Sequence, residues 1–303
     1  MKQFDQSSFI DNFLSHLEKA ETGENSSLHW LSVPIQNIKD PDDFEYRISI
    51  GGTNVVIYKN DTEITLLKIH SLKSGMELID KIVSKITPNA SSLYISLAFP
   101  ANQFQTDIGI SASVYKSVKD HNFDDIIGKD LAQIFCQKLP NLQKVQIIND
   151  VILLLKRNHD RYNTNAGLIL GTGFNVGIIK SNCIVNLEAG NFNEFDALET
   201  TRIIDRDSIN PGQQLLEKET SGRYMFLQYN LMKNERVIDS SNQLASIDDE
   251  CSRIIWAHTS EIVRCVTIAI ERFLSPNPVY WSYEGSVIEH LLESNLSIQG
   301  NKI

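Results

Sequence analysis

The pattern of apolar and polar positions along the chain alternates between the periods of helices and strands. Phe9, Phe13 and Leu17 fall on one face of a helix for which a serine at 7 or 8 is the expected N-cap. Residues 46–58 are rich in β-branched side chains and carry two glycines in their middle, which predicts a strand, a tight turn and a strand. Further elements are expected as strands over 62–69, 93–99 and 145–148, and as helices over 74–86, from Lys129 to Pro140, and from Val151.

The second half of the chain repeats this order of strands and then helices. Residues 167–179 contain two apolar runs around a glycine turn, which predicts a second hairpin. Helices are expected over 212–233, 247–274 and 286–292, with a last strand over 279–283. Strands followed by helices, twice over, indicate an α/β protein with two lobes.

Composition narrows the class of protein. A chain of 303 residues with 42% hydrophobic content can bury a large core, and its formal net charge of −10 argues against nucleic acid as a partner. The sequence has neither an apolar run of about 20 residues nor the apolar core of a signal peptide. The four cysteines are widely spaced and form no C-x-x-C, which favours free thiols. We therefore expect a cytoplasmic protein that does not bind membranes.

Two glycine loops are candidates for holding phosphate. They are residues 50–54 (I-G-G-T-N) and 171–175 (G-T-G-F-N), and each lies between strand-like runs. Glycine lets backbone N–H groups approach phosphate oxygens closely. Neither loop matches G-x-x-x-x-G-K-[ST] or G-x-G-x-x-G, so each taken alone is better explained as a plain hairpin turn, and only the context of the other motifs favours phosphate.

Asp150 is the candidate catalytic acid or base. It follows a short strand that ends at Asn149, and ligands of open α/β sheets bind at the carboxyl ends of strands. Phosphoryl transfer to an alcohol needs a carboxylate that accepts the hydroxyl proton. The alternative is that Asp150 only caps the helix that starts at Val151.

These strings resemble motifs of the hexokinase family and occur in the same order. The matching strings are S-S-L-H-W-L at 26–31, S-I-G-G-T-N at 49–54 (first phosphate loop), L-A-F-P at 97–100 (sugar loop), Y-K at 115–116, I-N-D at 148–150 (catalytic base), L-G-T-G-F-N at 170–175 (second phosphate loop), N-L-E-A-G-N-F at 186–192 (sugar), N-P-G-Q-Q-L-L-E-K at 210–218 with S-G at 221–222, and E-G-S-V at 284–287 (adenosine). Each string is weak alone, but the shared order is specific. The resemblance implies a two-lobed, actin/RNase H-like sugar-kinase fold with a cleft between the lobes.

The resemblance also implies a reaction and a site. Asp150 would take the proton of the 6-hydroxyl of a hexose such as glucose, and Lys116 would offset charge at the reacting end. ATP would be the phosphoryl donor, with Mg²⁺ near Ser49 and Asp150 but without a direct protein ligand. The implied sugar-binding residues are Phe99, Pro100, Tyr115, Lys116, Asn149, Asp150, Asn175, Glu188, Gln214 and Glu217. The implied ATP-binding residues are Gly51, Gly52, Thr53, Asn54, Gly171, Thr172, Gly173, Gly285 and Ser286.

Several positions depart from the family pattern and support a second reading. Ser49 stands where the first phosphate loop usually has Asp, Ala98 replaces a serine, and Tyr115 replaces a threonine. Magnesium prefers carboxylate and phosphate oxygens, so Ser49 in place of Asp is expected to weaken the binding of Mg²⁺. The chain also ends soon after the adenosine motif, where family members usually continue. Three readings remain open: a working hexose kinase, a catalytically weakened sugar-binding or sugar-sensing protein, and an α/β protein whose resemblance no longer reports function.

The expected organisation follows from the same strings. Residues 1–40 are expected to form an N-terminal helix and lead-in that pack on the large lobe. Residues 41–150 would form the small lobe, with the catalytic Asp at its end, and 151–303 the large lobe. A monomer or homodimer is expected.

Overall fold

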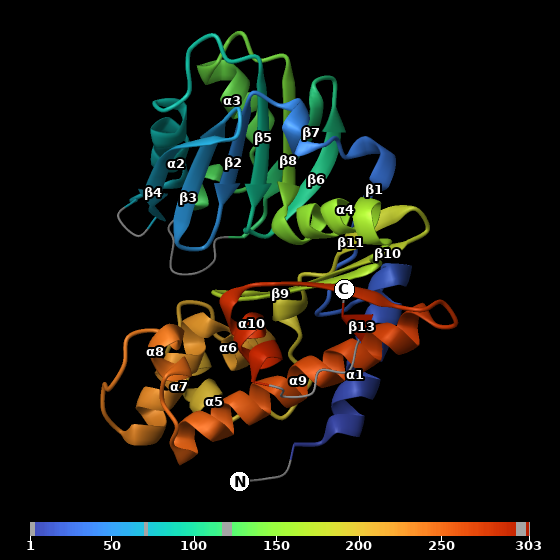
Figure 1. The fold of residues 1–303 in the computed structure, drawn as a ribbon, viewed down its shortest axis with the longest axis vertical. Coiled ribbons are helices and arrows are strands. Elements are labelled where there is room, and N and C mark those ends of the chain that lie inside the picture. Colours follow the sequence, from blue (N-terminus) through green and yellow to red (C-terminus); the bar gives the residue numbers. More distant parts are fainter. Residues whose placement is uncertain (1–3, 70–71, 117–122, 295–300, 303) are drawn as a thin grey trace. The chain divides into compact units, whose positions relative to one another are not determined.

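The computed structural model describes residues 4–69, 72–116, 123–294 and 301–302 (Figure 1). The chain divides into two compact units: unit 1 comprises Met1–Trp30, Arg157–Lys180 and Val185–Ile303, and unit 2 comprises Leu31–Lys156 and Ser181–Ile184. Residues 31–40 therefore fall in unit 2, whereas the sequence analysis grouped them with the large lobe. The reason is local: the Lys39 N–H donates to Gln146 Oε1 at 2.9 Å, and Gln146 Nε2 donates back to the Lys39 carbonyl at 3.1 Å.

Unit 2 is built on a seven-stranded sheet in the order β4-β3-β2-β5-β8-β7-β6. The strands are β2 (Tyr46–Ile50), β3 (Asn54–Lys59), β4 (Thr62–Lys68), β5 (Ser92–Leu97), β6 (Ala101–Thr106), β7 (Gly109–Val114) and β8 (Lys144–Asn149). Strands β2, β5 and β8 run parallel, and β7 is parallel to β8. The carboxyl ends of these four strands therefore lie at the same end of the sheet.

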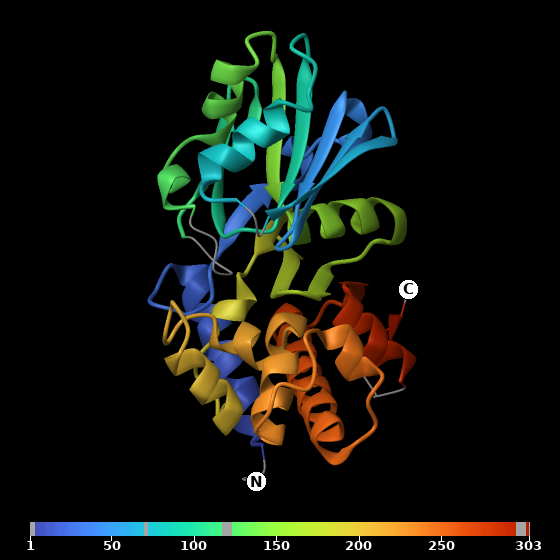
Figure 2. The same cartoon turned by 90° about the vertical axis from the view of Figure 1, so that its left-hand side faces the viewer.

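Helices α2 (Gly75–Val83) and α3 (Leu131–Lys138) cover one face of this sheet (Figures 1 and 2). Ile79 and Phe135 from these helices pack with strand residues such as Ile147 in one apolar cluster. Short 3₁₀ turns and the start of α4 complete the unit: η1 (Ile35–Asn37), η2 (Pro41–Asp43), η4 (Asp124–Ile126) and α4 (Asp150–Tyr162). Both expected strand-turn-strand features are confirmed, because β2–β3 and β9–β10 pair antiparallel around their glycines.

Unit 1 carries most of a six-stranded sheet in the order β1-β11-β10-β9-β12-β13. The strands are β1 (Leu31–Pro34), β9 (Ala166–Leu170), β10 (Phe174–Lys180), β11 (Cys183–Asn186), β12 (Tyr280–Glu284) and β13 (Asn301–Lys302). The helices are α1 (Gln6–Thr22), η5 (Ala189–Asn191), α5 (Glu199–Arg206), α6 (Leu215–Thr220), α7 (Gly222–Lys233), α8 (Ser241–Ala245), α9 (Glu250–Leu274) and α10 (Ser286–Glu293). Apolar side chains from all of these helices except α5 form one core with β9 and β10.

Helix α1 shows how the sequence sets its own ends. Asp5, rather than a serine, is the N-cap, because its carboxylate accepts the Ser8 N–H at 3.0 Å. Gly23 ends the helix with a φ of 77°. Phe9 and Phe13 pack on Phe192, with ring centroids 5.2 and 5.0 Å away. In the part of the chain that the structure describes, no helix has the length and apolar character needed to cross a membrane.

One expectation about the elements is wrong, and one hairpin was not predicted. The apolar pattern predicts one helix over 212–233, but the structure has α6 and α7, which meet at Ser221 in extended conformation (φ −83°, ψ 152°). The pattern also gives no hairpin over 101–114, where β6 and β7 pair antiparallel. Strand β6 lies at the sheet edge, so its polar residues Gln103 and Gln105 hide the alternation that marks a half-buried strand.

Candidate active site

Strand register brings the candidate residues of unit 2 to the carboxyl-terminal end of the sheet. Ile50 of β2 pairs with Leu97 of β5, and Leu97 pairs with Asn149 of β8. The first glycine loop, the sugar loop and the Asn149–Asp150 pair therefore leave three adjacent parallel strands at the same level. Open α/β sheets bind ligands at this end, where the strands have their carboxyl ends.

Asn149 and Asp150 sit at the start of α4. Asn149 is buried; its Nδ2 donates to the Leu97 carbonyl at 3.3 Å, and its Oδ1 accepts the Val151 N–H at 2.9 Å. Asp150 is the first residue of α4 and half-buried, and its Oδ1 accepts the same Val151 N–H at 2.8 Å. Because Asn149 also satisfies this N–H, the helix start does not depend on Asp150 alone. The helix N-terminus favours an anionic carboxylate at this position.

The sugar loop combines buried and half-buried candidates. Phe99 is 2% exposed and packs in the unit 2 core, with its ring centroid 5.4 Å from that of Phe123. Pro100 is buried, and its carbonyl accepts the Tyr115 N–H at 3.2 Å. Tyr115 and Lys116 are half-buried and follow the carboxyl end of β7. The main-chain bond between residues 100 and 115 thus joins the two expected sugar segments.

The first glycine loop forms a closed turn. The Gly51 N–H donates to the Asn54 carbonyl at 2.9 Å, and the Thr53 carbonyl accepts the Ile69 N–H at 3.0 Å. Gly52, within this turn, is buried. Ser49, one residue before the end of β2, is exposed and supplies a hydroxyl where a carboxylate would carry charge.

In unit 1 an asparagine pair holds the Glu188 segment. Asn186 Nδ2 donates to Glu188 Oε1 at 2.8 Å, and Asn186 Oδ1 accepts the Glu188 N–H at 3.0 Å. Asn175 Nδ2 donates to Asn186 Oδ1 at 3.0 Å, and Asn175 Oδ1 accepts the Ala189 N–H at 3.2 Å. Glycine loop 2 and the Glu188 motif are thereby joined into one polar network.

Glu217 reaches the same place from α6. Its Oε2 accepts the Phe174 N–H at 3.1 Å, while Oε1 is buried and has no hydrogen-bond partner among the described residues. A Cβ at Gly190 would lie 2.9 Å from the Phe174 carbonyl and 3.1 Å from Glu217 Cβ, so only glycine leaves Glu217 this position. A buried carboxylate oxygen without a partner costs free energy unless a ligand donates to it.

Two of the candidates have strained backbones. Glu188 has φ 46° and ψ 46°, and Gln214 has φ 53° and ψ 41°. Gln214 is buried, and its Oε1 accepts from Asn210 Nδ2 at 3.1 Å. Left-handed conformation costs a non-glycine residue about 1 kcal/mol or more, and such residues cluster at binding sites.

The second glycine loop contacts the adenosine string. A Cβ at Gly171 would lie 3.5 Å from Gly285 Cα and 3.6 Å from the Ser286 nitrogen. The Gly171 carbonyl accepts the Gly222 N–H at 2.8 Å. Gly222 begins α7 and Ser286 begins α10, and neither helix has a side-chain N-cap. Two helix N-termini and a glycine turn are a suitable environment for phosphate. Thr172 and Gly173 form the exposed and half-buried tip of the loop.

Sequence reasoning did not assign roles to Asn186, Lys218 and Gly222. Asn186 and Lys218 are 0% exposed, which is unusual for polar residues. All three lie inside strings that resemble the family, and this was the signal available for them.

Comparisons with known proteins agree with this geometry. The hexokinase family model matches residues 165–226. Hexokinase-9 of Oryza sativa subsp. japonica is 27% identical over 59% of this chain and 42% of its own length, and human hexokinase-3 is 27% identical over 69% of this chain and 27% of its own length. The chain thus spans less than half of these curated relatives.

Solved structures share the fold over most of the chain. Hexokinase from Schistosoma mansoni complexed with glucose has a TM-score of 0.76 at 17% identity and covers 96% of this chain and 87% of its own. A glucokinase of the ROK family from Streptomyces griseus, in complex with glucose and AMPPNP, has a TM-score of 0.57 at 15% identity and covers 84% of this chain and 90% of its own.

The fold is therefore the two-lobed, actin-like fold of the sugar kinases. Within that class, the family-model match over residues 165–226 and the curated relatives at 27% identity show that the chain is similar to the hexokinases.

Proposed function

We propose that the protein is an ATP-dependent hexose kinase that phosphorylates the 6-hydroxyl of glucose or a similar hexose. The observation that carries the proposal is the unpartnered, buried Glu217 Oε1 beside the Asn175–Asn186–Glu188 network. A hexose presents hydroxyls that both donate and accept, so an array of carboxylate and amide groups suits it. The proposal assigns Phe99, Pro100, Tyr115, Lys116, Asn149 and Asp150 of unit 2 and Asn175, Glu188, Gln214 and Glu217 of unit 1 to the sugar.

Asp150 is the general base of the proposed reaction. Its carboxylate accepts the proton of the 6-hydroxyl while that oxygen forms a bond to the terminal phosphorus of ATP and the bond from phosphorus to the leaving ADP oxygen breaks. Lys116 offsets negative charge on the transferred group. Asn149 fixes the start of α4 and therefore the direction of Asp150.

The residues around the second glycine loop fit a nucleotide. Gly171, Thr172, Gly173, Gly285 and Ser286 would hold the phosphates and the adenosine side, and Gly51, Gly52, Thr53 and Asn54 the remaining phosphate oxygens. Mg²⁺, when bound with ATP, would neutralise charge on the phosphates. Asp150 would be the carboxylate near this ion, and Ser49 would contribute a hydroxyl only.

The decisive experiment compares wild type with Asp150→Ala. Sugar-6-phosphate formation from glucose and MgATP is followed in a coupled assay, and glucose binding is measured by calorimetry. We expect turnover to fall about 10²-fold or more, the usual loss for an acid–base group, with glucose affinity largely kept. Unchanged turnover in the variant would refute the role of Asp150.

A sugar-binding or sugar-sensing protein with weak catalysis is the second candidate, and Ser49 favours it. In that case glucose raises the melting temperature of the wild type while no sugar phosphate forms. Ser49→Asp tests the cause: if Ser49 limits metal binding, the variant needs less Mg²⁺ for half-maximal activity. An identical Mg²⁺ requirement would show that another group holds the metal.

A further inference from the structure

Helix α6 buries three consecutive charged residues. Glu217, Lys218 and Glu219 are 5%, 0% and 0% exposed. Burying a charge without partners is costly, so each of them needs a compensating contact or a function. Glu217 faces the proposed sugar site, and Lys218 Nζ donates to Asp205 at 2.7 Å, to Ser208 Oγ at 2.9 Å and to the Asn210 carbonyl at 2.9 Å.

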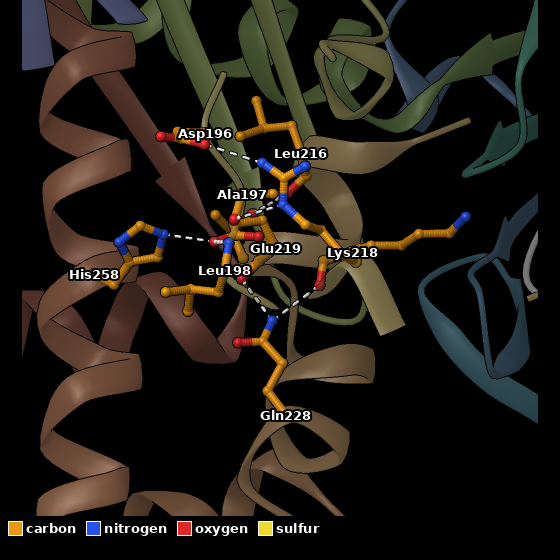
Figure 3. A network of polar contacts seen from close by, with 10 residues as sticks. Asp196, Ala197, Leu198, Leu216, Lys218, Glu219, Gln228 and His258 are labelled. Atoms are coloured by element: carbon orange, nitrogen blue, oxygen red, sulfur yellow. Dashed lines mark hydrogen bonds and ion pairs between the residues drawn. The ribbon is translucent and has the colours of Figure 1, made fainter. Parts of the chain in front are cut away.

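Glu219 is held by two other helices of unit 1, as Figure 3 shows. Its Oε1 accepts the Leu198 N–H at 3.1 Å and lies 2.5 Å from His258 Nε2 of α9. Leu198 is the N-cap residue of α5 and makes no side-chain cap, so the Glu219 carboxylate sits at the N-terminal end of α5. Gln228 Nε2 of α7 adds bonds to the Lys218 and Glu219 carbonyls at 3.0 and 2.9 Å.

The positions of the Glu219 and Glu217 side chains are coupled, because both residues lie on the short helix α6. Two residues along a helix correspond to a rotation of about 200°, so the two carboxylates point to nearly opposite sides of α6. A six-residue helix has little stability of its own, and its orientation depends on contacts with its neighbours. Any rotation that releases Glu219 from Leu198 and His258 therefore moves Glu217 relative to the Phe174 N–H.

We propose that Glu219 and His258 are positioning residues that fix α6 and thereby aim the Glu217 carboxylate at the hexose. This rests on the proposed function and assigns a role to a residue that lies between the family-like strings 210–218 and 221–222 without belonging to either. The pair sets hexose affinity and takes no part in proton or phosphoryl transfer.

The test compares Glu219→Leu, His258→Phe and Glu219→Gln in the full chain, with glucose as the probe. Glu219→Leu removes the acceptor for the Leu198 N–H, and His258→Phe keeps the ring's edge contact with Phe4 while removing the nitrogen. We expect the Kd and KM for glucose to rise about 10- to 100-fold in both, the scale of a small misplacement of a binding group. We expect kcat to change by less than about threefold, as for a loss of uniform binding. Glu219→Gln keeps an acceptor and should restore affinity to within about threefold of wild type.

Asp249→Asn is the control for general destabilisation. Asp249 caps α9 nine residues before His258, and among the described residues its carboxylate contacts Lys233, Tyr229 and the Ser252 N–H. It should lower the melting temperature and leave glucose affinity unchanged. If Glu219→Leu does not fold, His258→Phe carries the test.

Wild-type glucose affinity in folded Glu219→Leu or His258→Phe, or an equal loss of affinity in Asp249→Asn, would overturn the positioning role while the proposed function stands. Absence of glucose binding in the wild type would instead overturn the proposed function, and the positioning role with it.

Discussion

Replacing Gly190 by alanine tests the packing of the proposed sugar site most directly. The new Cβ would lie 2.9 Å from the Phe174 carbonyl and 3.1 Å from Glu217 Cβ, while ordinary contact begins at 3.4 Å. The methyl must therefore push both neighbours away, by about 0.5 Å at the carbonyl. The bond between the Phe174 N–H and Glu217 Oε2 spans this gap and is 3.1 Å long, so it lengthens or breaks.

The magnitude follows from overpacking and from this bond. Inserting a methyl into a packed core costs about 1–3 kcal/mol, and a hydrogen bond to a charged group contributes about 1.5–3 kcal/mol. If roughly half of this is expressed as misplacement of Glu217, glucose affinity falls about 10- to 100-fold, because 1.4 kcal/mol corresponds to tenfold. Gly190 has no left-handed backbone, so the effect is steric alone.

The assay is glucose binding by calorimetry, with urea unfolding in parallel. Gly23→Ala is the matched control: it has a φ of 77° and no atom within 4 Å of the new Cβ, so it strains the end of α1 without touching the site. We expect it to lose about 1 kcal/mol of stability and no affinity. Wild-type affinity in Gly190→Ala would refute the placement of Glu217 against the sugar.

Three further outcomes follow from contacts elsewhere. Lys218→Met should lower the free energy of unfolding in urea by about 3–5 kcal/mol, because it leaves a partly buried carboxylate without its cation. Hydrogen bonding to Lys233 lowers the pKa of Asp249 from 3.8 to about 2, so the stability difference between wild type and Asp249→Asn should be complete above pH 4 and vanish as the pH falls towards 2 in acid titrations followed by circular dichroism. Gly285→Ala should cost more than about 3 kcal/mol by thermal unfolding, since φ is 117° and the new Cβ would lie 2.5 Å from the Leu170 carbonyl.

The sequence anticipated features that are encoded locally. The glycine turns at 51–52 and 171–173 join strands, as expected, because glycine and the flanking β-branched residues act over a few positions. The position of Asp150 directly after β8 was also predictable, because the apolar run that marks this strand ends at the preceding residues. The family-like order of strings then supplied the fold class, which periodicity alone gives only as α/β.

Features that arise from distant contacts were not predictable. Lys218 reads as a surface residue, and its burial depends on an ion pair with Asp205 thirteen positions away. Likewise, Glu219 gains its role only when α5 and α9 fold against α6. The break between α6 and α7 is set by the Gly222 N–H bonding to Gly171, a contact that no local pattern records.

The left-handed backbones of Glu188 and Gln214 have a consequence for how this protein responds to selection. Glycine at either position would relax the main chain by about 1 kcal/mol while deleting a proposed sugar contact. A library screened only for heat resistance should therefore enrich glycine at 188 and 214, and a library screened for growth on hexose should purge it. If glycine is enriched at these two positions in the first screen and depleted in the second, Glu188 and Gln214 are retained for ligand binding and not for stability. This comparison needs no purified enzyme.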